Sequence, residues 1–215
     1  MSEIVNERIV AYINSLDTGN SLVCDAIEKE ALADNVPIIR KEMSNLLKVL
    51  LALKQPSNIL EVGTAVGYSS ILMSENMPDN CHITTIENYD KRIPVAKNNF
   101  KRAGKEEVIT LLEGDAMEIL QTLDGAYDFI FMDAAKGQYI NFLPHLMRLM
   151  PKGGLLISDN VLQEGDIVES RYGVTRRNRT IHTRMREYIY MLTHSDELIT
   201  SVVPIGDGIT LSVKK

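Results

Sequence analysis

Hydrophobic positions along the chain follow two different spacings. In the first 56 residues, apolar side chains recur every three or four positions, for example at Ile9, Tyr12, Ile13 and Leu16, which is typical of amphipathic helices. Beyond that point, short apolar runs alternate with helical patterns. We expect strands at residues 58–62, 82–87, 108–112, 128–132 and 153–158, and helices at 67–77, 90–103, 115–123 and 137–150. Strands that alternate with helices form a parallel sheet covered on both faces, so the pattern predicts a doubly wound α/β fold.

Proline and glycine positions divide the rest of the chain. Val36-Pro37 predicts a helix start, and Pro56 closes the helical region. A helix at 177–194 precedes two short strands, 198–203 and 207–213, whose close connection predicts an antiparallel last strand at or near the sheet edge. The sequence contains no internal repeat and no linker. We therefore expect one domain over 1–215, with a helical cap at 1–56 and an α/β core at 57–215.

The stretch from Ile59 to Ser70 predicts a buried strand, a glycine turn and the start of a helix. Gly63 and Gly67 allow the backbone to turn tightly and to approach a ligand closely. Their spacing differs from the G-x-G-x-x-G of dinucleotide sites, which argues against a nicotinamide-dependent reductase. The acid inside the strand, Glu61, would repel a pyrophosphate but suits a cationic, hydroxyl-bearing ligand such as S-adenosylmethionine. A tight turn without any ligand is the alternative.

Composition limits the class of protein. The chain has 215 residues, of which 45% are hydrophobic and 24% charged, as in an ordinary globular protein. Cys24 and Cys81 lie far apart and in no metal-binding spacing, which indicates two reduced thiols. Neither a signal peptide nor an apolar run of membrane-spanning length is recognisable. These features predict a cytoplasmic protein that is not inserted in a membrane.

Acidic side chains follow nearly every predicted strand. In an open α/β sheet, ligands bind at the carboxyl ends of the strands. The acids and amide at these ends are Glu61, Glu87, Asp115, Asp133, Asp159 and Asn160. Glu87 stands about two dozen residues after the glycine turn, where an acid accepts hydrogen bonds from ribose hydroxyls. Asp115 also fits a helix N-cap.

A second group of oxygen donors predicts a metal site. Asp133, Asp159 and Asn160 follow adjacent strands, and two carboxylates with an amide oxygen suit Mg²⁺ or a similar hard cation. Lys136 follows Asp133 by three residues and could act as a general base, although a surface lysine at a helix start is an equal interpretation. Met43 could pack on a cofactor or belong to the core.

One basic segment stands out in a chain whose net charge is −6. Between Arg171 and Arg186 there are six arginines and no acid. Such a segment could bind phosphates, or it could be a solvated helix start that pairs with acids elsewhere.

Taken together, the glycine turn, Glu87, Gly114-Asp115-Ala116, Asp133-Ala134-Ala135-Lys136 and Ser158-Asp159-Asn160-Val161-Leu162 resemble the cation-dependent, S-adenosylmethionine-dependent O-methyltransferases of the catechol and caffeoyl-CoA type. The resemblance implies a Rossmann-like class I methyltransferase fold with seven strands, the last antiparallel. It also implies roles for particular residues. The cofactor would be bound by Met43, Glu61, Gly63, Ser69, Glu87, Asp115, Ala116 and Asp133. Asp133, Asp159 and Asn160 match the metal ligands, and Lys136 matches the catalytic lysine.

Within that family the chain looks most like the bacterial branch that methylates 5-hydroxyuridine at the wobble position of tRNA. This narrower resemblance rests on Gln163-Glu164-Gly165, which follow the metal segment, and on the arginine-rich stretch 172–182. This implies an anticodon loop as substrate, with Arg176, Arg177 and Arg179 as candidate contacts, and a homodimer as a family property. The catechol enzymes carry a tryptophan beside the metal aspartate, whereas this chain has none and places Ala134 and Ala135 there. A small-molecule O-methyltransferase and a non-catalytic cofactor- or RNA-binding protein are the alternatives.

Overall fold

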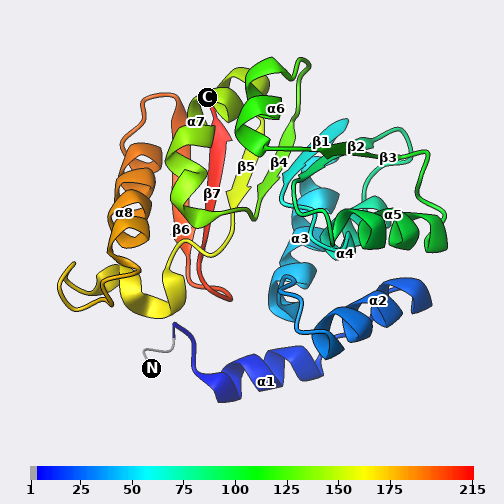
Figure 1. Cartoon of the computed structure of the whole chain (residues 1–215), viewed down its shortest axis with the longest axis horizontal. Helices are drawn as coiled ribbons and strands as arrows, with labels where there is room; N and C mark the ends of the chain where they lie inside the picture. Colours follow the sequence, from blue (N-terminus) through cyan, green and yellow to red (C-terminus); the bar gives the residue numbers. More distant parts are fainter. Residues whose placement is uncertain (1–3) are drawn as a thin grey trace.

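A seven-stranded sheet lies between two layers of helices in the computed structural model, which describes residues 4–215 (Figure 1). The strand order is β3-β2-β1-β4-β5-β7-β6. The strands are β1 Asn58–Val62, β2 His82–Glu87, β3 Ile109–Glu113, β4 Phe129–Met132, β5 Leu155–Ser158, β6 Leu198–Val203 and β7 Ile209–Lys214. The first five strands pair in parallel, whereas β7 runs antiparallel to both of its neighbours, β5 and β6.

Helices cover both faces of the sheet. They are α1 Glu7–Ser15, α2 Leu22–Ala33, α3 Lys41–Lys54, α4 Tyr68–Ser74, α5 Ile93–Arg102, α6 Ala116–Thr122, α7 Tyr139–Leu149 and α8 Arg179–Thr193, with 3₁₀ segments η1 Lys136–Gln138 and η2 Gln163–Val168. Side chains alternate across each strand, so Ile59 packs in one core with α2 to α5 and Leu60 in a second core with α6 to α8. Both cores consist mainly of buried apolar side chains, which explains why the parallel strands read as continuous apolar runs.

The class I methyltransferase topology predicted from the sequence is confirmed. The bounds predicted for β1, β2 and β6 match those observed, and the last strand is antiparallel, one position in from the edge. The helix start predicted at Val36-Pro37 is wrong. α3 begins at Lys41, and its N-cap Arg40 is still extended, at φ −72° and ψ 158°. A proline pushes the residue before it toward extended backbone, and here the extended segment continues to the wall of the cavity described below.

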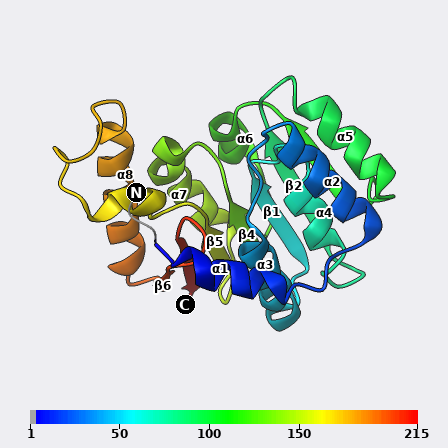
Figure 2. The ribbon, with the colours of Figure 1, turned by 90° about the horizontal axis from the view of Figure 1, so that it is seen from below.

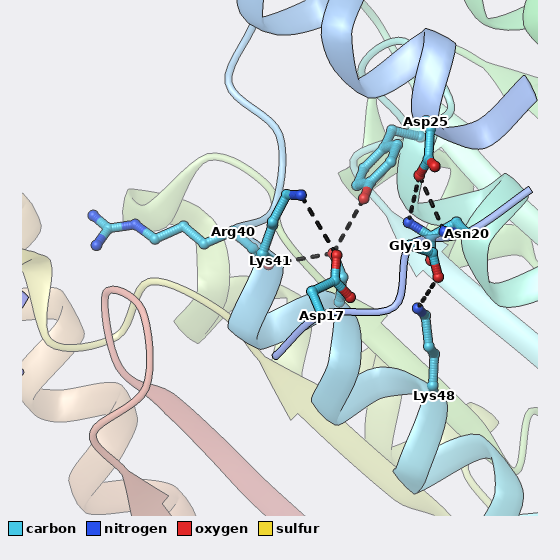
Figure 3. Close-up of polar contacts among 9 residues, drawn as sticks. Asp17, Gly19, Asn20, Asp25, Arg40, Lys41 and Lys48 are labelled. Carbon is cyan, nitrogen blue, oxygen red and sulfur yellow. Dashed lines mark hydrogen bonds and ion pairs between the residues drawn. The ribbon is translucent and has the colours of Figure 1, made fainter. Parts of the chain in front are cut away.

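Polar contacts fasten the first helices of the cap to one another. Figure 2 shows α1 running across one end of the molecule beside α3. Lys41 and Lys48 of α3 reach the α1–α2 connection at Asp17 and at the carbonyl of Gly19, each at 3.4 Å, and Arg40 points away from this group (Figure 3). Asn20 in turn donates twice to Asp25 at 3.1 Å. The connection between α1 and α2 is therefore held against α3.

Cys24 and Cys81 are both free and buried, and burial raises the pKa of the Cys81 thiol to about 11. Among the helices of residues 4–215, none combines the length and the apolar character needed to cross a membrane.

Candidate active site

A cavity of about 640 Å³ opens at the carboxyl ends of β1, β2, β4 and β5, where the α/β fold predicts a ligand site. Its wall brings together the expected cofactor-binding, metal-ligating and catalytic residues, except Glu61. Those lining it are Met43, Gly63, Ser69, Glu87, Asp115, Ala116, Asp133, Lys136, Asp159 and Asn160. A volume of this size is typical of a site for a small molecule or cofactor.

The glycine turn after β1 forms one side of the cavity. Gly63 has φ +105°, and a Cβ added there would collide with the backbone carbonyl oxygen of Asp133. Only glycine therefore lets the end of β1 pass so close to the end of β4. The amides of Gly63 and Thr64 both donate to the carbonyl of Ile86, at 3.0 and 3.1 Å, which fixes the turn against β2.

Glu61 does not line the cavity but lies behind its wall. Its carboxylate is completely buried and accepts hydrogen bonds from the hydroxyls of Ser69 and Thr85, each at 2.5 Å, and from Ser70. Burial raises the pKa of Glu61, and the three hydroxyls oppose that shift. Because Ser69 does line the cavity, Glu61 orients a side chain of the site rather than facing the space itself.

Glu87 and Asp115 stand on the same side of the cavity as the glycine turn. Glu87 Oε2 accepts from the amide of Ala65 at 2.7 Å, and Oε1 accepts from the amides of Asn88 and Tyr89 at 3.0 and 2.9 Å. The carboxylate is thus held in one orientation at the end of β2. Asp115 caps α6 by accepting from the amide of Met117 at 2.8 Å, so the N-cap interpretation is confirmed for a residue that also lines the cavity.

Asp133 and Asp159 are brought together at the ends of the neighbouring strands β4 and β5. Asn160 bridges them, since its amide side chain donates to Asp133 Oδ1 at 2.8 Å and its backbone amide donates to Asp159 Oδ1 at 2.7 Å. Burial raises the pKa of Asp133, and burial followed by the charge of Asp133 raises the pKa of Asp159 to about 7. Asn160 has a left-handed φ of +61°, a conformation that non-glycine residues keep only where the surroundings enforce it.

Lys136 begins η1 and lies in the same wall. Its positive charge lowers the pKa of both Asp133 and Asp159, but no lysine or arginine among residues 4–215 forms an ion pair with either acid. Asn160 thus holds together a buried carboxylate, that of Asp159, and a partly buried one, that of Asp133, and neither is neutralised by an ion pair within residues 4–215. The described residues contain no cluster of three Asp, Glu, His or Cys side chains arranged for a metal ion, so any metal here would be held by two acids and an amide.

Two features of the site escaped the sequence interpretation. Tyr139, the first residue of α7, is completely buried and donates to the carbonyls of Met132 and Asp159 at 3.3 and 3.1 Å, tying together the ends of β4 and β5. Asp207, in the β6–β7 turn, lines the cavity and pairs with Arg40 at 2.7 Å. No sequence signal relates residues 40 and 207, whereas Tyr139 could have been suspected from its place three residues after Lys136.

The arginine segment divides into two parts. Arg176 and Arg177 are exposed in the connection between η2 and α8, and Arg179 lies over the ring of Tyr172 at 5.6 Å. None of these three lines the cavity. Arg184 and Arg186, farther along, donate to backbone carbonyls of Gly137 and Ile167 at 2.9 and 3.2 Å, so they fasten α8 to η1 and η2.

Comparisons with known proteins agree with this geometry. A family model described as O-methyltransferase matches residues 9–215. A catechol O-methyltransferase of Niastella koreensis is 35% identical over 135 residues, and the match spans 61% of this chain and 61% of that relative. Caffeoyl-CoA O-methyltransferase 1 of Eucalyptus globulus is 32% identical over 187 residues, covering 82% of this chain and 74% of the relative. The chain belongs to the O-methyltransferase family.

Solved structures share the whole architecture. A Staphylococcus aureus protein assigned as a caffeoyl-CoA O-methyltransferase superposes with a TM-score of 0.89 at 31% identity, covering 98% of this chain and 100% of that one. TomG, an O-methyltransferase of Streptomyces achromogenes involved in tomaymycin synthesis, was solved with S-adenosylmethionine. It superposes with a TM-score of 0.83 at 25% identity, covering 97% of this chain and 96% of TomG.

Proposed function

We propose that this protein transfers a methyl group from S-adenosylmethionine to a hydroxyl oxygen held beside a divalent cation, with tRNA as the acceptor. The observation that carries the chemistry is the pair of carboxylates of Asp133 and Asp159 in the wall of a cofactor-sized cavity, with no lysine or arginine of residues 4–215 in an ion pair with either. The test is direct. Purified protein is incubated with the cofactor, Mg²⁺ and tRNA containing 5-hydroxyuridine, and the nucleosides are examined by mass spectrometry for one added methyl group.

The side of the cavity at β1 and β2 suits the cofactor. Glu87 is held by three backbone amides and retains lone pairs for ribose hydroxyls. The acidic wall suits a cation better than a pyrophosphate, and Gly63 lets the end of β1 pass close to the backbone of Asp133 in that wall. Met43, Ser69, Asp115 and Ala116 complete that side. The cofactor supplies an electrophilic methyl group on a positively charged sulfur.

The side at β4 and β5 suits a hard divalent cation. Its donors are two carboxylates and an amide, and oxygen ligands of this kind are those that Mg²⁺ prefers. A cation would also relieve the repulsion between Asp133 and Asp159 that raises the pKa of Asp159. A bound cation acts as a Lewis acid that lowers the pKa of a neighbouring hydroxyl.

Asp133, Asp159 and Asn160 would then orient the acceptor, and Lys136, acting as the neutral amine, would take the proton of the acceptor hydroxyl on Nζ and become an ammonium. The acceptor oxygen forms its bond to the methyl carbon while the sulfur–carbon bond breaks and its electron pair stays on sulfur. Positioning of both reactants and exclusion of water account for much of the rate.

The choice of tRNA as acceptor rests on Arg176 and Arg177. Both are exposed and close in sequence to the metal segment, and neither has a carboxylate partner among the described ion pairs. Arginines there would contact phosphates of an anticodon loop, whose bases can be splayed into a site. Replacing both by alanine should weaken tRNA binding and reduce its salt slope by about two. Alanine replacements of exposed Lys29 and Lys101 are the matched control. Equal weakening in both variants would contradict the tRNA assignment.

The relatives favour a second candidate, a small acceptor of the catechol or caffeoyl-CoA kind, because these are the activities for which they are named. Both acceptors present two neighbouring oxygens to a cation. Methylation of a catechol with no turnover on tRNA would decide for the small molecule.

We also propose a homodimer, supported by the outer face of α1. Ile9, Tyr12, Ile13 and Leu16 are 54, 66, 42 and 62% exposed, an apolar stripe that a second copy could cover. Light scattering after size exclusion tests this, and an Ile9→Glu/Tyr12→Glu variant should shift a dimer to a monomer.

A further inference from the structure

The glycine turn contains a strained alanine. Ala65 lines the cavity with a left-handed φ of +48°, and its amide donates to Glu87 Oε2 at 2.7 Å. A residue with a side chain keeps this conformation only where its surroundings enforce it, and such strain is concentrated at ligand sites. Within the turn, the amide of Gly67 donates to the carbonyl of Thr64 at 2.8 Å. Further support comes from a helix packed against the turn.

Helix α5 holds the turn through Asn99. This side chain is only 3% exposed, and its Nδ2 donates to the backbone carbonyl of Val66 at 2.9 Å. The next residue, Phe100, packs so closely on Gly67 that a Cβ added to that glycine would collide with its ring. Helix α5 therefore contacts both residues that follow Ala65, one through a buried hydrogen bond and the other through packing.

The orientation of the Asn99 amide is itself determined. Arg102, one turn farther along α5, donates to Asn99 Oδ1 at 3.0 Å. An amide oxygen accepts and an amide nitrogen donates, so this contact leaves Nδ2 directed at the carbonyl of Val66. Arg102 is held in turn by Glu30 of α2, through two hydrogen bonds at 2.6 and 2.8 Å. A chain of polar contacts thus runs from α2 to the glycine turn.

We propose that Asn99 is a positioning residue for the cofactor. By holding the carbonyl of Val66, it keeps Ala65 in the left-handed conformation whose amide fixes the carboxylate of Glu87. This role rests on the proposed function, in which the glycine turn and Glu87 bind S-adenosylmethionine. Asn99 lies outside the wall of the cavity, so it acts through the backbone of the turn and not by touching a ligand.

The test replaces Asn99 by aspartate, which has nearly the same shape. Aspartate keeps an acceptor for Arg102 but presents an oxygen in place of Nδ2 to the carbonyl of Val66, and the two oxygens repel each other. We expect the affinity for S-adenosylhomocysteine, measured by isothermal titration calorimetry, to fall at least about tenfold. Asn98→Asp makes the identical change at the exposed neighbouring position of α5 and should leave this affinity unchanged.

A double-mutant cycle separates a positioning role from a purely structural one. Two changes that act through one contact are not additive, so in a Glu87→Gln background Asn99→Asp should cost at most about threefold in affinity. A purely structural role would lower the free energy of unfolding in urea and leave the affinity of the folded protein unchanged. Unchanged affinity in folded Asn99→Asp, an equal loss in Asn98→Asp, or full additivity with Glu87→Gln would overturn the proposal.

A second variant covers the case in which Asn99→Asp does not fold. Arg102→Met keeps Asn99 but removes the donor to its Oδ1, and we expect a loss of affinity of about threefold. Unchanged affinity in Arg102→Met would then overturn the proposal. A parent protein that does not bind S-adenosylhomocysteine would contradict the proposed function itself, so that failure is distinct from normal binding in the parent and in both variants.

Discussion

Two pairs of acids stand at the same rim of the sheet, yet their surroundings differ. Glu61 and Glu87, on β1 and β2, each accept three hydrogen bonds from the protein. Asp133 and Asp159, after β4 and β5, both depend on Asn160 and repel each other. The first pair has its charge distributed over protein donors, and the second has charge left over for a ligand. Acids of similar sequence context therefore have opposite surroundings: Glu61 and Glu87 are satisfied by protein donors, whereas Asp133 and Asp159 are the acids that we propose hold a cation.

The largest effect should come from Asp159→Asn. Loss of one carboxylate removes half of the charge that holds the proposed cation. We expect turnover to fall by at least about 100-fold, since even outer partners of metal ligands cost 10–100-fold when lost. Steady-state methyl transfer measures this, with excess chelator as the metal-free reference. Glu113→Gln, an exposed acid at the end of β3, is the control and should retain activity. Full turnover of Asp159→Asn in chelator would rule out the metal role.

The second largest effect should be a loss of thermal stability when the cation is removed. If Mg²⁺ binds only the folded protein, a concentration of 100 times its dissociation constant adds about 2.7 kcal/mol. For a chain of this size that raises the melting temperature by about 5–10 °C. Differential scanning fluorimetry with and without Mg²⁺ measures the shift, which Asp133→Asn should abolish and Glu61→Gln should leave intact. A shift preserved in Asp133→Asn would place the cation elsewhere.

On the other side of the rim, Glu87→Gln should act on the cofactor alone. The neutral amide would lose the charge-assisted hydrogen bonds that we propose for the ribose hydroxyls, and its nitrogen would face backbone amides that also donate. We expect the affinity for S-adenosylhomocysteine to fall about tenfold. Calorimetry measures this, and the stabilisation by Mg²⁺ should remain. Unchanged cofactor affinity would show that Glu87 only supports the backbone.

Much of this contrast could be predicted from the sequence, because parallel strands buried on both faces leave a clear apolar pattern. The bounds of β1 and β2 and the acids after each strand follow from it. Contacts between residues that are far apart in the sequence could not be predicted. The Arg40–Asp207 pair joins residues that only the β6–β7 turn brings together, and local patterns carry no trace of it. Glu61 was expected beside the cofactor, but hydroxyl groups enclose its carboxylate. The sequence could not predict this, because an acid at a strand end gives no sign of which side chains will surround it.

The smallest predicted effect concerns two buried tyrosines beside β5, and it tests whether the rigidity of the β4–β5 rim matters for metal binding. Tyr139 and Tyr188 are both buried in the second core, their rings 5.5 Å apart, and both use their hydroxyls near β5. Tyr139 donates to the carbonyls of Met132 and Asp159, whereas Tyr188 contacts the Ser158 hydroxyl at 2.6 Å. Either tyrosine changed to phenylalanine should lower the free energy of unfolding by about 1 kcal/mol in urea.

Metal affinity should separate these two variants. The hydroxyl of Tyr139 joins the backbone at Asp159 to the end of β4, just before Asp133, so its loss lets the two carboxylates move relative to each other. We expect Tyr139→Phe to weaken Mg²⁺ by about tenfold, as outer partners of metal ligands do, and Tyr188→Phe to leave it unchanged. Equal Mg²⁺ affinities in the two variants would mean that Asn160 alone sets the spacing of the two acids, and that the rigidity of the β4–β5 rim is unrelated to metal binding.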